Sequence, residues 1–191
     1  TSPAGEDGEL WAPHNRLNST NPCGEYAFLD DTSCNLASIN LYGFYDPETD
    51  SYDLEGYAQY IDLVQLVLES SINWGQFPTE DIARRTEVFR TTGLGVANLG
   101  SLLMVKGMPY DSEKARQYSA SLISLLTGRS YAVSALMAKK IGPFSAYELN
   151  KDHMKRVIRN HARASAALET PYEERSYEPY KLDADALAEL G

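Results

Sequence analysis

An amide, a thiol and a carboxylate alternate along one short segment, at Asn21, Cys23 and Glu25. In an extended chain, alternate side chains point the same way at ~3.3 Å per residue, so these three would line one face. Three different reactive groups would then meet one ligand. Pro22 lacks an N–H and Gly24 lacks a side chain, which leaves the opposite face compact. This form suits a finger inserted into a barrel or a cleft.

The same segment also fits a polar surface turn, because Asn-Pro is a common turn starter. Cys34 follows Cys23 by eleven residues. It could be a small buried hydrophobe ahead of the apolar stretch 36–41, or the disulfide partner of Cys23. A lasting disulfide is the less expected choice in an acidic, cytoplasmic protein. Two thiols near one carboxylate would instead favour redox chemistry.

Longer stretches around these residues resemble a known family. The motifs NPCGEY at 21–26 and FLDDTSCNLASINL at 28–41 look like the active-site finger loop of the large ribonucleotide reductases. The spacing of the two cysteines looks like the adenosylcobalamin-dependent branch. Later motifs agree in order: TGLGVANLG at 92–100, PYDS at 109–112, GPF at 142–144 and HMKRVIRNH at 153–161. The similarity runs from about residue 15 to residue 164.

The resemblance implies thiyl-radical chemistry that turns a ribonucleotide into its 2′-deoxy counterpart. By this analogy Cys23 would remove the 3′ hydrogen, Glu25 would be the base at the 3′ hydroxyl, and Asn21 would orient the sugar hydroxyls. Cys34 would belong to the dithiol that supplies reducing electrons after water leaves C2′. Radical initiation must come from a cofactor, and adenosylcobalamin is implied. The sequence identifies no residue that would hold it.

The resemblance also implies partners: a ribonucleoside di- or triphosphate substrate, a thioredoxin-type reductant and the remaining segments of the catalytic subunit. The family's reducing cysteine pairs with a cysteine nearer the N-terminus of the catalytic domain, whereas Cys23 and Cys34 are the two in this sequence. The phosphate-binding Pro-Thr-Gly-Thr segment is also missing. We therefore expect a fragment, split product or separately encoded portion of the catalytic barrel.

Two other functions stay open. One is a non-catalytic assembly or interaction module that needs complementary chains to be active. The other is a stand-alone thiol oxidoreductase that uses both cysteines, although no Cys-x-x-Cys motif is present.

The elements that must position these residues are mostly helices. Apolar residues at three- and four-residue steps, with capping residues before them, predict helices at 54–74, 80–88, 97–106, 112–141 and 151–167. The expected N-caps include Asp53, Asp111 and Asn150. Extended chain is expected at 36–41 and 89–96, too few strands for a closed barrel. The expected fold is thus helix-rich α/β and, by resemblance, part of the ten-stranded reductase barrel with its finger loop.

Composition narrows the functional classes. The 191 residues carry 17 Lys and Arg against 27 Asp and Glu, a net charge of −10. Such acidity argues against nucleic-acid binding, and no apolar run approaches a membrane span. Two cysteines make no disulfide scaffold, so a cytoplasmic setting is expected. The histidines lack metal-ligand spacing, and no metal is expected.

Residues 1–14 are expected to be a flexible loop, 15–167 the central barrel segment and 168–191 an acidic linker or docking tail. A stripe of Lys151, Lys155 and Arg159 is either a solvated face or a docking surface for acidic chain.

Overall fold

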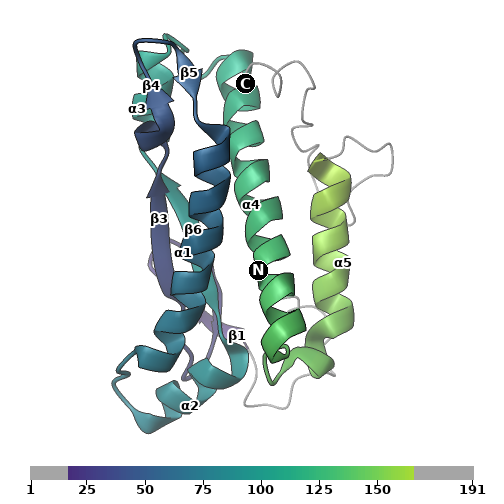
Figure 1. The fold of residues 1–191 in the computed structure, drawn as a ribbon. Coiled ribbons are helices and arrows are strands. Elements are labelled where there is room, and N and C mark those ends of the chain that lie inside the picture. Colours follow the sequence, from purple (N-terminus) through teal and green to yellow (C-terminus); the bar gives the residue numbers. More distant parts are fainter. Residues whose placement is uncertain (1–16, 166–191) are drawn as a thin grey trace.

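Helices dominate the computed structural model, which describes residues 17–165 (Figure 1). Its helices are α1 (Leu54–Trp74), α2 (Glu80–Phe89), α3 (Leu99–Val105), α4 (Glu113–Ile141), α5 (Tyr147–Ser165) and the short 3₁₀ helix η3 (Leu41–Phe44). Its strands are β1 (Leu17–Thr20), β2 (Ala27–Leu29), β3 (Asn35–Asn40), β4 (Tyr45–Asp46), β5 (Ser51–Tyr52) and β6 (Thr92–Ala97). The loop expected at 1–14 and the acidic tail expected at 168–191 lie outside the described residues.

The strands pair into three small sheets. β1 pairs with β2 and β4 with β5, both antiparallel, whereas β3 pairs with β6 in parallel. Parallel strands need a long crossover connection, and here it contains α1 and α2. Within residues 17–165 these sheets form no closed barrel. The expectation of a helix-rich mixed α/β fold is confirmed, while the larger barrel remains a prediction.

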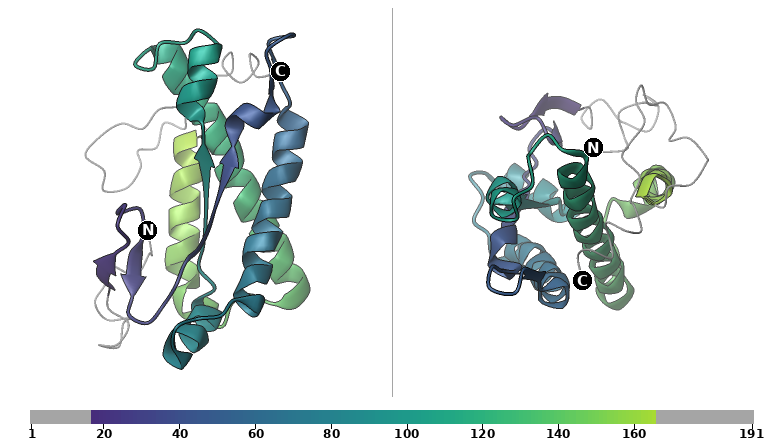
Figure 2. Two further views of the ribbon diagram at one scale, coloured as in Figure 1. Left: turned by 90° about the vertical axis from the view of Figure 1, so that its left-hand side faces the viewer. Right: turned by 90° about the horizontal axis from the view of Figure 1, so that it is seen from above.

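α1 covers one face of the parallel pair, as the two views in Figure 2 show. Asp53 caps this helix as expected, since its side chain accepts a hydrogen bond from the Gly56 N–H at 2.8 Å. The buried side chains of α1 recur at steps of three and four residues: Tyr57, Ile61, Gln65, Leu68 and Ile72. The periodicity therefore identified both the helix and its inner face.

The core lies where α1, α3 and α4 meet the parallel strands. Ile39 of β3, Ile61 of α1 and Leu122 of α4 are all fully buried in one cluster. The Tyr57 hydroxyl, inside this cluster, donates a hydrogen bond to the Leu122 carbonyl at 3.3 Å. Packing and this polar contact together fix α4 against α1.

Two expected helix starts are wrong. α4 is capped by Ser112, not Asp111, and the Ser112 side chain accepts from the Ala115 N–H at 3.1 Å. Serine and aspartate cap about equally well, so neighbouring candidates cannot be separated by type. α5 begins at Tyr147, and Asn150 lies inside it, buried, with its amide donating to the Ala146 carbonyl at 2.9 Å.

The helices of residues 17–165 include none that is both long and apolar enough to cross a membrane.

We expect Leu122→Ala to destabilise the chain by about 2–5 kcal/mol, because a fully buried leucine leaves a cavity when truncated. Urea unfolding monitored by circular dichroism measures this free energy. Leu136→Ala is the matched control on the same helix, since Leu136 is 62% exposed and its loss should cost no more than about 0.5 kcal/mol. Equal losses in the two variants would contradict the assigned core.

Candidate active site

The Asn21–Glu25 segment forms the turn between β1 and β2. The Gly24 N–H donates to the Asn21 carbonyl at 3.0 Å, and the Asn21 N–H donates to the Tyr26 carbonyl at 3.2 Å. Pro22 takes the second turn position, which suits its fixed φ, and Gly24 has a φ of +79°, where glycine is favoured. The extended arrangement expected for these residues is wrong, and the turn interpretation is confirmed.

Two of the three reactive groups of the turn are exposed to solvent, and the third is partly buried. Cys23 and Glu25 are exposed at the tip, and the Cys23 thiol is free. Asn21 is half-buried, and its Oδ1 accepts a hydrogen bond from the Tyr26 N–H at 3.1 Å. The Asn21 Nδ2 group and the second lone pair of Oδ1 can therefore serve a ligand without breaking the turn.

Cys34 lies just before β3, between two residues that are anchored to helices. The Ser33 hydroxyl lies 2.9 Å from the Thr86 hydroxyl of α2, and the Asn35 amide donates to the Ser71 hydroxyl of α1 at 2.7 Å. Because side chains alternate along extended chain, anchoring Ser33 and Asn35 on the helix side directs Cys34 to the opposite face of the pair.

That opposite face is only partly covered, and small residues line it within the described chain. Leu36, next on this face after Cys34, is 64% exposed. Gly93 and Gly95 of β6 pair with Leu36 and Ser38 of β3. A Cβ added at Gly93 would lie 3.3 Å from the Cys34 sulfur, so the thiol packs directly over this glycine.

The structure brings Glu25 close enough to Cys34 to affect its ionisation. Burial raises the pKa of the Cys34 thiol, and the negative charge of Glu25 raises it further. Burial also raises the pKa of the Tyr26 phenol. At neutral pH Cys34 is therefore held as a thiol, which can give up hydrogen and electrons, rather than as a nucleophilic thiolate.

A chain of polar contacts fixes the frame around Cys34, and sequence reasoning missed it. The Tyr26 and Thr91 hydroxyls lie 3.1 Å apart. Arg90 at the end of α2 pairs with Glu69 of α1 and donates to Asn73 Oδ1 at 3.1 Å. Tyr26 belongs to the motif at 21–26, and this gave a weak indication that it could matter for the site. The contacts of Arg90 join residues that are far apart in the sequence, so no local sequence pattern could have predicted them.

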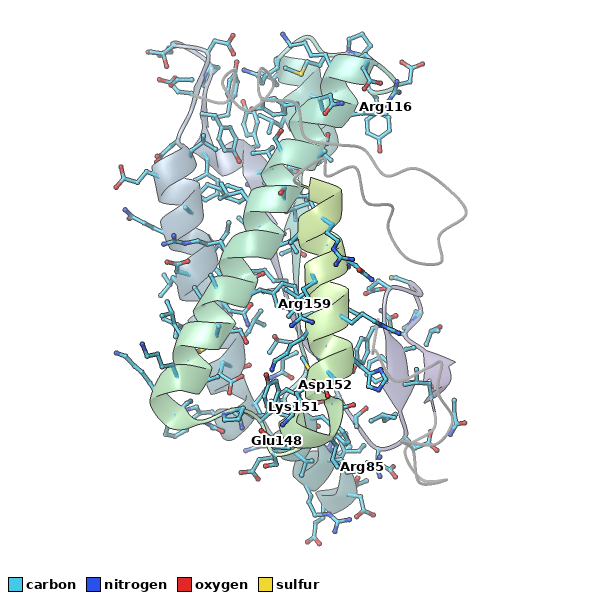
Figure 3. All side chains as sticks on the ribbon, turned by 90° about the vertical axis from the view of Figure 1, so that its right-hand side faces the viewer. Arg85, Arg116, Glu148, Lys151, Asp152 and Arg159 are labelled. Carbon is cyan, nitrogen blue, oxygen red and sulfur yellow. The ribbon has the colours of Figure 1, made fainter. Side chains whose placement is uncertain are left out.

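Two other features lie outside this constellation. A cleft of about 680 Å³ lies among α1, α2, α4 and α5, with Gln65, Tyr131 and Ile158 in its walls. In the basic stripe of α5, Lys151 pairs with Glu148 at 2.5 Å (Figure 3). Whether an acidic chain docks on this stripe stays a prediction. Residues 17–165 contain no cluster of three or more His, Cys, Asp or Glu that could hold a metal ion.

Known proteins match nearly all of the sequence. Residues 6–189 match the family described as ribonucleotide reductase, barrel domain. A vitamin B12-dependent ribonucleotide reductase of Agrobacterium fabrum is 48% identical over 166 residues, 87% of this chain and 13% of the relative. The enzyme of the same name from Bradyrhizobium diazoefficiens is 47% identical over 167 residues, with the same coverage of both chains.

A more distant relative is the vitamin B12-dependent ribonucleoside-diphosphate reductase of Thermoplasma acidophilum. It is 32% identical over 131 residues, 69% of this chain and 17% of the relative. The chain spans about 13% of the length of the two bacterial relatives above. Because the family match extends over almost the whole sequence and includes the turn, Cys34 and the parallel strands, this chain belongs to the ribonucleotide reductase barrel-domain family.

Proposed function

We propose that this chain is part of a ribonucleotide reductase that converts ribonucleotides to 2′-deoxyribonucleotides for DNA synthesis. The observation that carries the proposal is the turn that exposes the Cys23 thiol and keeps the Glu25 carboxylate near Cys34. A radical thiol, a base and a reducing thiol are the groups that this reaction needs. The names of the most similar relatives agree with it.

Each side chain has a distinct role in the proposed reaction. A thiyl radical on Cys23 takes the 3′ hydrogen atom of the ribose, while Glu25 accepts the proton of the 3′ hydroxyl. The Asn21 side chain orients a sugar hydroxyl, with its Nδ2 group as donor, while its Oδ1 holds the turn by accepting from the Tyr26 N–H. The 2′ hydroxyl then leaves as water, and the 3′ hydrogen atom returns from Cys23 at the end.

Cys34 is proposed to supply reducing equivalents. Net replacement of the 2′ hydroxyl by hydrogen, with release of water, requires two electrons and two protons, which come from two thiols that become a disulfide. Because Cys23 carries the radical, the second thiol must come from another segment of the catalytic subunit. A thioredoxin-type protein would reduce the disulfide, and the substrate would be a ribonucleoside di- or triphosphate.

The exposed thiol also fits the implied cofactor. Adenosylcobalamin, when bound, supplies the radical that oxidises a thiol, and a thiol at the tip of a turn is open to such a partner. Of the described residues, the exposed tip with Cys23 would face the cofactor. We assign none of them to holding the corrin ring.

A second candidate is an assembly or interaction module that has no activity without complementary chains. The unpaired outer edges of the β3–β6 pair favour it, because within the described residues they are open to a strand from another chain. The two candidates differ in one measurement: when the chain is mixed with the remaining segments of the catalytic subunit, Cys23→Ser should abolish nucleotide reduction only if the first candidate is right.

We expect Cys23→Ser to abolish deoxynucleotide formation in the assembled enzyme, because a hydroxyl cannot replace the thiol as the hydrogen-atom carrier. Product formation from a radiolabelled ribonucleotide measures the loss, and sedimentation shows whether assembly is kept. Product formation at the wild-type rate would overturn the assignment.

We expect Cys34→Ser to stop multiple turnover while 3′ hydrogen removal continues, because only the reducing electrons are lost. Exchange of tritium from the 3′ position separates these two steps. Cys23→Ser is the matched comparison, since it should lose the exchange as well. An absence of exchange in Cys34→Ser would contradict the role given to Cys34.

A further inference from the structure

We propose that Tyr26 is a positioning residue, whose hydroxyl contact with Thr91 fixes the reactive turn relative to Cys34. The contact itself does not depend on the proposed function, whereas its consequence for catalysis does. The hydroxyl oxygens of Tyr26 and Thr91 lie 3.1 Å apart, and their positions in the sequence differ by 65.

The turn has few other attachments. Figure 2 shows the β1–β2 hairpin on the side of the β3–β6 pair opposite α1. Among the hydrogen bonds between residues 17–165, the Tyr26–Thr91 contact is the only one that joins the hairpin to the parallel strands and the helices. Loss of this contact would loosen the reactive tip, which would then keep the chain connection through 30–33 and the packing of the buried Leu29.

Tyr26 is tied tightly to the turn that it would position. Its N–H donates to Asn21 Oδ1 at 3.1 Å, and its carbonyl accepts from the Asn21 N–H at 3.2 Å. Its ring packs edge-on against Phe28, with the ring centroids 4.6 Å apart. A displacement of the Tyr26 backbone would therefore move Asn21, Cys23 and Glu25 together.

The other end of the contact is rigidly held. The Thr91 carbonyl accepts from the Asn35 N–H at 3.3 Å, next to Cys34. Arg90, the preceding residue, joins α2 to α1 through Glu69 and Asn73, with its side chain only 17% exposed. The Tyr26 hydroxyl thus reaches the one segment that is fixed both to α1 and to the start of β3.

The ionisation of Cys34 reports the position of the turn. The charged or titratable groups coupled to Cys34 are Glu25 and Tyr26, both from the hairpin. The side-chain contacts of its neighbours with α1 and α2 are made by neutral hydroxyl and amide groups. If the turn moves away, burial of Cys34 and the influence of Glu25 both decrease, so the pKa of the thiol should fall.

The test uses the 191-residue chain with Cys23→Ala, in which Cys34 is the single thiol. Adding Tyr26→Phe keeps the ring and removes the hydroxyl. We expect faster alkylation of Cys34 by iodoacetamide and a lower pH midpoint, since a fall of about half a pKa unit raises the thiolate fraction about threefold well below the midpoint. Thr91→Val should have the same effect, and Thr91→Ser should keep the parental rate.

Three further variants make the test specific. The double variant Tyr26→Phe with Thr91→Val should alkylate no faster than either single variant, because both remove the same contact. Glu25→Gln should lower the midpoint with the contact intact. Tyr45→Phe, which removes a tyrosine hydroxyl bonded to Asp50, should leave Cys34 unchanged. Urea unfolding of each variant shows that the fold is kept.

The proposal would be overturned if Cys34 were alkylated at the parental rate in both Tyr26→Phe and Thr91→Val. Strictly additive effects on the rate in the double variant would also overturn it. In the assembled reductase, Tyr26→Phe with Cys23 restored should lower kcat by about 10- to 100-fold with little change in KM. Thr91→Ser should retain kcat. If the alkylation changes appear but the wild-type chain reduces no ribonucleotide, the positioning role stands and the proposed function fails.

Discussion

The arrangement of the candidate site depends on the parallel pairing of β3 with β6. Parallel pairing brings the segments that precede the two strands to the same end, so Cys34 and Thr91 become neighbours although they lie far apart in the sequence. The crossover between the strands places α1 on one face, and the β1–β2 hairpin lies on the side of the other face. Without this pairing the turn would have no fixed point near the second thiol.

The two cysteines sit in opposite environments, and this contrast follows from that pairing. Cys23 is exposed on a turn, where other molecules can reach the thiol. Cys34 is half-buried over Gly93, with a carboxylate nearby that disfavours its ionised form. The Cys23 thiol is accessible to other molecules. The Cys34 thiol is kept in its protonated form, which protects it from unwanted nucleophilic reactions.

The sequence was most informative where structure is local. The spacing of apolar residues after Asp53 predicted α1 with its cap, because helix periodicity and capping act within a few residues. The motif around Cys23 predicted candidate reactive residues, yet not their conformation, since Pro22 is compatible with extended chain and with a turn. The link between Tyr26 and Thr91 depends on tertiary packing, and no local pattern encodes it.

The two outer edges of the β3–β6 pair have a consequence for how the chain behaves in solution. In the described residues each of these strands has one neighbour, so the outer edges present rows of unpaired N–H and C=O groups. Parallel sheets are usually wider and covered on both faces. Such edges act as templates, and they would drive concentration-dependent self-association through β-augmentation wherever another strand does not occupy them.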